Sequence, residues 1–357
     1  MSYPKLVFDL NKLKKNLDVL GEACHQANCT MMIVTKSFCA DPNVIDMIDA
    51  HPLVDYLADS RVKNLKKMTN LNKEKVLLRI PQESELSEMV KYADISFQSE
   101  QAILSKTDAA AFEHGRKHKV VLMIDLGDLR EGIFYKDKEK IFDTAKQILK
   151  SDNLILHGIA TNLTCYGAII PKPDNLSILV HIAKEIEEKF SVKLNMISGG
   201  NSSSYYLLSK SQMPTGINNL RLGEAFVLGN ETAYGERIQG TYNDGIQLKA
   251  QIVELKAKPS MPIGESGVDA FGNKPVYEDR GIIERAILAV GQQDIDPGSI
   301  TPTDPKVEIL GASSDHMILD VSNSKKDYTV GDIMSFTLGY GGLLKAATSD
   351  YVYKEYI

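Results

Sequence analysis

A lysine ends a run of apolar residues in the stretch "MMIVTKSFCA", residues 31–40. Met31 to Val34 predict a buried β-strand, and Lys36 stands where that strand should end. Strand-end lysines commonly lay an apolar stem along the protein and hold the ammonium in water. The alternative is a lysine that reacts with a ligand. Position alone favours the first interpretation, so the choice depends on the sequence around the stretch.

Strand-like and helix-like segments alternate around this stretch. Residues 9–27 precede it with apolar residues at helical spacing, and residues 177–190 form another helix pattern. Apolar strands between helices indicate a parallel sheet, and eight of them predict a closed (β/α)8 barrel of the TIM type. An open doubly wound sheet would show fewer strands and a GxGxxG turn after the first, which this sequence lacks. The eight runs are 30–36, 54–60, 76–80, 94–99, 119–127, 156–163, 194–200 and 219–223.

The pattern changes after about residue 235. Helical spacing fades, and strand-like runs separated by turn residues continue to the end of the chain. We therefore predict a (β/α)8 barrel over residues 11–235 and a C-terminal all-β domain over residues 236–357. Residues 1–10 contain "YPKLVFDL", which we expect to add a strand to the β domain.

Composition narrows the class of protein. The 357 residues are 43% hydrophobic and 25% charged, as in a globular protein, and the net charge of −6 argues against a nucleic-acid partner. No apolar run reaches the ~18 residues of a membrane span, and no secretory signal is visible. The four cysteines include no CxxC pair. We expect reduced thiols, no metal site and a cytoplasmic location.

Barrel active sites lie at the C-terminal ends of the strands. "SGGNSSS", residues 198–204, ends the seventh predicted strand, and its glycines would let the backbone approach a ligand closely. Ser202 could begin a helix, where an anion is favoured, and "RLGE" follows at the eighth strand. A flexible surface loop is the alternative, but together the two segments predict a phosphate site. The other candidates at strand ends are Lys36, Asp125, Arg130, Asn162, Cys165, Tyr166 and Arg221.

A lysine and a phosphate site at the same end of a barrel predict pyridoxal phosphate. The lysine would form a Schiff base with the aldehyde of this cofactor, which acts as an electron sink for a carbanion. In this setting the reactive interpretation of Lys36 is favoured over the strand-end one.

These residues resemble the alanine racemase family, the fold-type III pyridoxal-phosphate enzymes, over nearly the whole chain. The resemblance implies that Lys36 in "VTKS" is the Schiff-base lysine and that Arg221 faces the pyridine nitrogen. It also implies a homodimer in which each active site is completed by the partner's β domain. The cofactor-binding residues that it implies, with their neighbours in the same motifs, are Lys36, Arg130, Asn162, Asn201, Ser202, Arg221, Gly223, Glu224 and Tyr340.

Several positions depart from the family pattern. Gln292 in "VGQQDI" stands where the family has a catalytic tyrosine, and glutamine cannot take a proton. Met123 replaces a carbamylated lysine, Asn162 a histidine and Ala40 a tyrosine. "GASSDH" (311–316), with "TNLTCYG" and "SGGNSSS", is similar to the divergent branch of amino-acid racemases that includes ornithine racemase.

The resemblance implies racemisation, with Lys36 exchanging the α-proton on one face of the substrate. A racemase needs an acid or base on the opposite face as well. With the tyrosine missing, the candidates are Cys165, Ser314, Asp315 and His316. For Cys165 a buried structural role is the favoured alternative, whereas "SSDH" occupies a motif position and is predicted to be catalytic or substrate-binding.

The substrate is predicted from charge. A carboxylate near the substrate would pair with a side-chain ammonium and favour ornithine or lysine. Asp315 and Glu224 are the candidates, although Glu224 could instead pair with Arg221 or Arg237.

Other functions also agree with parts of this sequence. Alanine racemase proper is one, and a fold-type III decarboxylase of basic amino acids is another. The decarboxylases use a cysteine of the small domain, and residues 236–357 contain none. A non-catalytic cofactor carrier would lack the second domain, and a sugar-phosphate barrel enzyme would be colourless.

Overall fold

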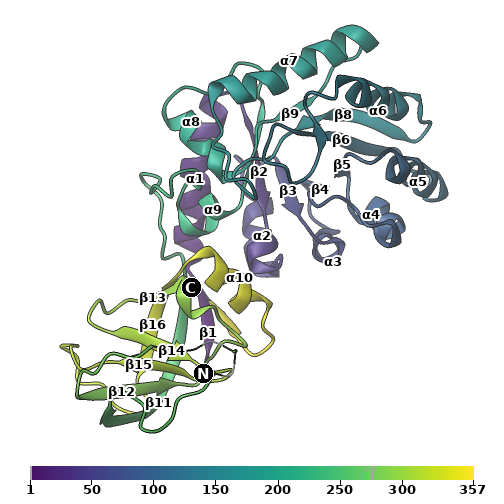
Figure 1. Ribbon diagram of the computed structural model, residues 1–357. Coiled ribbons are helices and arrows are strands. Elements are labelled where there is room, and N and C mark those ends of the chain that lie inside the picture. The colour runs from purple at the N-terminus through teal and green to yellow at the C-terminus, as the bar shows by residue number, and fades with distance from the viewer. Residues whose placement is uncertain (1, 270, 273, 275) are drawn as a thin grey trace. The chain divides into compact units, whose positions relative to one another are not determined.

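The computed structural model describes residues 2–269, 271–272, 274 and 276–357. It consists of two compact units. Lys12–Tyr242 form one unit, and the chain up to Asn11 forms the other together with Asn243–Ile357. Figure 1 labels the elements of both.

The unit Lys12–Tyr242 is a closed parallel barrel. In its described residues, eight strands pair in the order β5-β4-β3-β2-β10-β9-β8-β6, and pairing between β5 and β6 closes the ring. The predicted (β/α)8 barrel is confirmed, and each predicted run overlaps one strand. The strands are β2 (Thr30–Val34), β3 (Tyr56–Asp59), β4 (Glu74–Leu77), β5 (Ile95–Gln98), β6 (His118–Asp125), β8 (Leu154–Ala160), β9 (Met196–Ser198) and β10 (Asn219–Leu222), with the short β7 (Ile133–Phe134) beside β6.

Helices lie around the outside of the barrel strands (Figure 1). None of the described helices is long and apolar enough to cross a membrane. The α-helices are α1 (Leu10–Gln26), α2 (Pro42–Asp49), α3 (Val62–Leu65), α4 (Leu86–Tyr92), α5 (Gln101–Glu113), α6 (Lys138–Lys150), α7 (Pro173–Phe190), α8 (Tyr205–Ser209) and α9 (Glu224–Leu228). The 3-10 turns of this unit are η1 (Lys36–Phe38), η2 (Lys66–Met68), η3 (Glu83–Glu85) and η4 (Ser202–Ser204).

Alternate residues of the strands fill the barrel with apolar side chains. Successive side chains of a strand point to opposite faces, so residues two apart share the interior. The cluster combines such pairs, for example Ile95 with Phe97 on β5. It consists of Met32, Val34, Ala58, Val76, Ile95, Phe97, Val121, Met123, Ala160 and Met196. Lys36 comes two positions after Val34, at the C-terminal end of the barrel.

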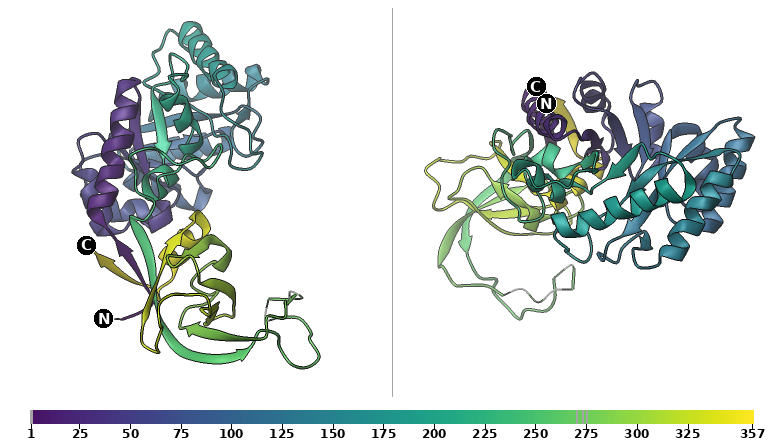
Figure 2. Two further views of the ribbon diagram at one scale, coloured as in Figure 1. Left: turned by 90° about the vertical axis from the view of Figure 1, so that its left-hand side faces the viewer. Right: turned by 90° about the horizontal axis from the view of Figure 1, so that it is seen from above.

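The second unit is a largely antiparallel β structure. Its main sheet has the order β13-β16-β11-β12-β15-β14, and β1 pairs with β11 and with β17. β11 is long and curved (Figure 2), and its pairing shifts register between Ile252 and Glu254. The elements are β1 (Lys5–Phe8), β11 (Ile246–Pro259), β12 (Ile282–Leu288), η5 (Pro297–Ser299), β13 (Ile300–Pro302), β14 (Glu308–Ala312), β15 (Met317–Asp320), β16 (Ile333–Leu338), α10 (Tyr340–Thr348) and β17 (Tyr353–Tyr356).

The units divide after Tyr242, later than the boundary expected at residue 235. The segment after α9 folds back on the barrel unit instead of leaving it. The backbone N–H of Ile238 donates to the Gly229 carbonyl at 2.9 Å. The N–H of Tyr242 donates to Asn16 Oδ1 at 2.7 Å, which ties the segment to α1.

We expect His118 to make the stability of the barrel unit depend on pH. Its ring is 1% exposed, its Nε2 lies 2.8 Å from Ser96 Oγ, and burial lowers its pKa to about 4. An unfolded histidine has a pKa near 6.5, so below that pH the unfolded chain takes up a proton that the folded chain refuses. We expect the free energy of unfolding to fall by roughly 3 kcal/mol between pH 7 and pH 4 through this group.

Urea unfolding of His118→Gln at several pH values tests this expectation, because the variant should lose this part of the slope. His114→Gln is the matched control, since His114 is exposed beside Ser87. An unchanged slope in His118→Gln would show that another group is responsible.

Candidate active site

The turn after β2 presents Lys36. Thr35 holds the turn to β3, with its N–H 2.8 Å from the Ala58 carbonyl and its hydroxyl donating to Asp59 Oδ2 at 2.6 Å. Asp59 is fully buried, which raises its pKa, and its hydrogen bonds oppose that rise. The chain then turns sharply through Cys39 at φ 55°. Lys36 is left exposed at the barrel end, where a reactive lysine would have to be.

Arg221 on β10 is a buried cation at the same end of the barrel. Its Nη1 donates to Ser198 Oγ at 2.6 Å, and its Nη2 donates to the Thr161 carbonyl at 2.7 Å. Nη2 also lies 3.4 Å from Asn162 Oδ1, and Cζ lies 5.3 Å from the centre of the Phe97 ring. Burial lowers the pKa of Arg221 to about 10. The guanidinium therefore stays charged at neutral pH and covers the apolar layer of the barrel.

Asn201 joins the loops after β8 and β9. Its Nδ2 lies 2.8 Å from Asn162 Oδ1 and 3.3 Å from Cys165 Sγ. Its Oδ1 accepts from the Ser203 N–H at 2.8 Å and so caps η4. Cys165 is an exposed free thiol, so the expectation of a buried structural cysteine is wrong. The reason is local, because Cys165 lies beyond the strand in a loop whose side chains meet Asn201.

Glu131 connects Arg130 to this group, although no motif in the sequence marks it. Its carboxylate forms a two-pronged ion pair with Arg130 and accepts from Asn162 Nδ2 at 3.2 Å. The only signal was an acidic residue beside an arginine expected to bind cofactor. The structure thus brings one hydrogen-bonded network together from predicted residues of four strand ends: Arg130, Asn162, Cys165, Asn201 and Arg221.

The loops after β9 and β10 meet through Ser202. Its Oγ accepts from the N–H groups of Gly223 and Ala225, at 3.3 and 3.1 Å. A Cβ atom at Gly223 would lie 3.3 Å from Val34 Cβ, so this loop also packs on the strand that ends at Lys36. Burial raises the pKa of Glu224, and the charge of Lys36 opposes that rise.

Buried hydroxyls at this end fit a ligand rich in hydrogen-bonding groups. Ser37, Thr161 and Ser203 have buried Oγ atoms with no hydrogen-bond partner among the described residues. They follow β2, β8 and β9, the strands that carry Lys36, Asn162 and Asn201. A buried hydroxyl without a partner is costly and calls for an explanation. Donors in these positions suit a phosphate or a substituted pyridine ring, so the residues present fit pyridoxal phosphate.

In the β unit, the SSDH turn between β14 and β15 packs on the loop of Gln292. The Gln292 N–H donates to the Ser313 carbonyl at 2.8 Å, and its Nε2 donates to the Ala312 carbonyl at 2.9 Å. Asp315 and His316 are exposed, and His316 Nδ1 lies 3.8 Å from Asp315 Oδ2. Tyr340 is the first residue of α10. The roles predicted for Asp315, His316 and Tyr340 stay predictions.

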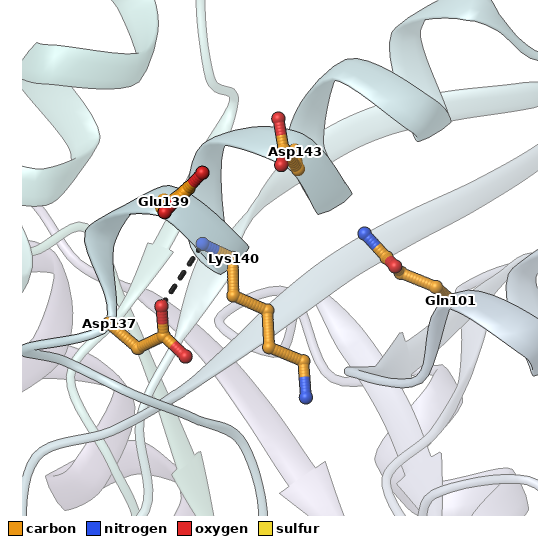
Figure 3. A pocket seen from close by; sticks show the side chains of 5 residues that line it. All are labelled: Gln101, Asp137, Glu139, Lys140 and Asp143. Atoms are coloured by element: carbon orange, nitrogen blue, oxygen red, sulfur yellow. Dashed lines mark hydrogen bonds between the residues drawn. The ribbon is translucent and has the colours of Figure 1, made fainter.

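A surface pocket elsewhere on the barrel unit is lined by different kinds of side chain. Figure 3 shows it beside the start of α6, where Asp137 caps the helix by accepting from the Lys140 N–H at 3.2 Å. Its other lining residues are Gln101, Glu139 and Asp143, and none of the five belongs to the predicted site. A cofactor phosphate would meet mainly carboxylates there, so this pocket is not a candidate.

Comparison with known protein families identifies the family of this chain. The family described as "Alanine racemase, N-terminal domain" matches residues 8–231. This chain belongs to the alanine racemase family. The resemblance inferred from the sequence motifs is therefore confirmed.

Two curated relatives extend the match over the β unit. The ornithine racemase of Acetoanaerobium sticklandii is 54% identical over 353 residues, which cover 99% of each chain. The lysine racemase of Thermotoga maritima is 38% identical over 358 residues, which cover 100% of this chain and 99% of the relative.

A solved structure supports the fold of the family. The alanine racemase from Bartonella henselae with covalently bound pyridoxal phosphate superposes with a TM-score of 0.74 and covers 100% of both chains. It is only 14% identical, so it supports the architecture and not the reaction.

A substitution at Gly200 tests how closely the loop before η4 is packed. Its φ is +116°, and a Cβ atom there would lie 2.6 Å from Ser204 Oγ. We expect Gly200→Ala to lower the free energy of unfolding by about 1–3 kcal/mol, because both backbone strain and crowding oppose the side chain. Gly127→Ala is the matched control, since Gly127 has a φ of +115° but open space around its Cβ position.

Denaturant titration of both variants measures the difference. Gly200→Ala should lose more stability than Gly127→Ala. Equal losses would mean that the loop has no close packing at Gly200.

Proposed function

We propose that this chain is a pyridoxal-phosphate-dependent racemase that interconverts the enantiomers of ornithine. The observation that carries the proposal is the network of Arg130, Asn162, Asn201 and Arg221 at the barrel end that also holds Lys36. The identity of 54% to an ornithine racemase over almost the full length supports both the reaction and the substrate. A lysine racemase at 38% identity supports the wider class of diamino acids.

The cofactor would be held by the residues at the strand ends. We assign Ser202 and Gly223 to the cofactor phosphate, and Asn201, Glu224 and Tyr340 to the same part of the site. Arg130 and Asn162 would face the ring. Arg221 would face the pyridine nitrogen, and because arginine only donates hydrogen bonds, that nitrogen would stay unprotonated. The buried hydroxyls of Ser37, Thr161 and Ser203 support a ligand in this place.

Racemisation moves one proton at the substrate Cα. Bound pyridoxal phosphate withdraws electrons from Cα and makes its proton acidic. We assign Lys36 Nζ to take or return that proton on one face. Glu224 is half-buried, and the charge of Lys36 acts on it.

The opposite face needs a second proton carrier. Cys165, Asp315 and His316 are the proposed candidates. The contact between Cys165 Sγ and Asn201 supports the cysteine, because it joins the thiol to the proposed cofactor-binding residues. The exposure of His316 and Asp315 beside Gln292 supports the SSDH turn, since a proton carrier must reach the substrate.

We also propose a homodimer with shared active sites and a cytoplasmic location. The family resemblance supports the dimer. The four free cysteines support a reducing compartment.

Lys36→Ala tests the lysine. Protein loaded with pyridoxal phosphate is expected to be yellow, and borohydride should bleach the colour and fix the cofactor to the chain. Lys36→Ala should show neither effect, because no other lysine is assigned to the aldehyde. Lys63→Ala, an exposed lysine of α3, is the control and should behave as wild type. Bleaching and fixation that persist in Lys36→Ala would contradict the assignment.

A substrate panel tests the reaction. We expect incubation with L-ornithine in deuterium oxide to give D-ornithine and deuterium at Cα, measured by chiral chromatography and mass spectrometry. The kcat/KM for ornithine should exceed that for alanine by about tenfold or more, because a charge-assisted hydrogen bond to the side-chain ammonium contributes about 1.5–3 kcal/mol. Release of carbon dioxide would indicate a decarboxylase, and a preference for alanine would contradict the proposed substrate.

A further inference from the structure

Glu131 is a carboxylate enclosed by the proposed cofactor-binding residues. Its side chain is 19% exposed, compared with 41% for its partner Arg130. Both carboxylate oxygens contact Arg130, and Oε1 also accepts from Asn162 Nδ2 at 3.2 Å. An arginine–carboxylate pair with two parallel hydrogen bonds fixes the plane of the guanidinium. The direction of Arg130 therefore depends on Glu131.

The same carboxylate decides which way the Asn162 amide points. An amide offers donors on its nitrogen and acceptors on its oxygen. Because Asn162 Nδ2 donates to Glu131, its Oδ1 faces two donors, Asn201 Nδ2 at 2.8 Å and Arg221 Nη2 at 3.4 Å. The opposite amide orientation would place donor against donor at Asn201 and at Arg221.

The orientation of the Asn162 amide also affects η4. Asn201 gives its nitrogen to Asn162 and its Oδ1 to the Ser203 N–H, which caps the turn that carries Ser202. Glu131, Asn162 and Asn201 therefore form a directed chain of hydrogen bonds that ends at the proposed phosphate loop. Reversing the orientation of one amide would remove its hydrogen bond to the next residue in this series.

Charge gives Glu131 a second role. Arg130 and Arg221 are two cations on one side of the barrel, and the negative charge of Glu131 acts on both and opposes the lowering of their pKa by burial. The residues of the apolar cluster, Met123 among them, carry no charge. The counter-charge at this place comes from the loop after β6.

We propose that Glu131 is a positioning residue of the active site: its carboxylate orients Arg130 and, through Asn162 and Asn201, the residues that hold the cofactor. This inference rests on the proposed function, because it assumes that pyridoxal phosphate binds here. Glu131 itself needs no contact with substrate or cofactor.

Glu131→Gln tests the proposal, since it keeps the shape of the side chain and removes the charge and one acceptor. Apoprotein of each variant is titrated with pyridoxal phosphate, followed by absorbance. We expect Glu131→Gln to weaken binding by about tenfold or more, as for loss of a hydrogen bond to a charged group, and to shift the absorption maximum of the bound cofactor. Glu131→Asp keeps the charge and should recover part of the affinity.

Two controls separate positioning from general effects. Glu139→Gln removes an exposed carboxylate from α6 (Figure 3) and should bind as wild type does. In a background of Asn162→Ala, the change at Glu131 should cost less than it does in wild type, because the two act in one chain. Thermal unfolding of each apoprotein identifies any variant that fails to fold.

The outcomes are distinct. Wild-type affinity and an unchanged spectrum in Glu131→Gln would overturn the positioning role, as would full additivity with Asn162→Ala. Should Glu131→Gln fail to fold, Glu131→Asp decides by the same two readouts, with an unchanged spectrum again overturning the role. A wild-type protein that binds no pyridoxal phosphate would overturn the proposed function, and this inference with it.

Discussion

A buried guanidinium organises the active end of the barrel. Arg221 is 4% exposed, and removing a charge from water is costly unless hydrogen bonds and opposite charge compensate it. Ser198, Thr161 and Asn162 provide the hydrogen bonds, from the ends of β8 and β9. The strand order places β9 next to β10 and β8 next to β9, so the closed barrel brings these strand ends around the buried cation.

The site is layered. Below Arg221 the barrel is apolar, and the Phe97 ring lies against the guanidinium. Above it, loop side chains form hydrogen bonds with one another, with Asn162 and Asn201 as the central amides. This arrangement differs from the family pattern inferred from the sequence, in which a modified lysine stands at Met123 and a histidine at Asn162. In this chain the loop carboxylate of Glu131 and the amides of Asn162 and Asn201 form a hydrogen-bonded group at this end of the barrel.

Much of the fold could be read from the sequence for a simple physical reason. Strands of a closed parallel barrel are buried on both faces, so they appear as continuous apolar runs such as residues 119–127. The end of such a run marks the active end of the barrel, which is why Lys36, Asn201 and Arg221 could be selected. The boundary between the two units was harder to predict. Residues 229–242 have the composition of a linker, yet they bind the barrel through Asn16.

The contacts between particular side chains could not be predicted from the sequence. Glu131 is adjacent to Arg130 in the chain, but its value lies in the contact with Asn162, which follows a different strand. The exposure of Cys165 likewise depends on how its loop meets Asn201. Such contacts depend on loop conformation, for which one sequence has no periodic signal. The motifs therefore identified the members of the site and not the bonds between them.

A crystal structure of this protein grown with pyridoxal phosphate would test the proposed site most directly. We expect density continuous with Lys36 Nζ, the phosphate beside Ser202 and Gly223, and the pyridine nitrogen within hydrogen-bonding distance of Arg221. A cofactor bound elsewhere, or a ring whose nitrogen meets a carboxylate instead of Arg221, would contradict it.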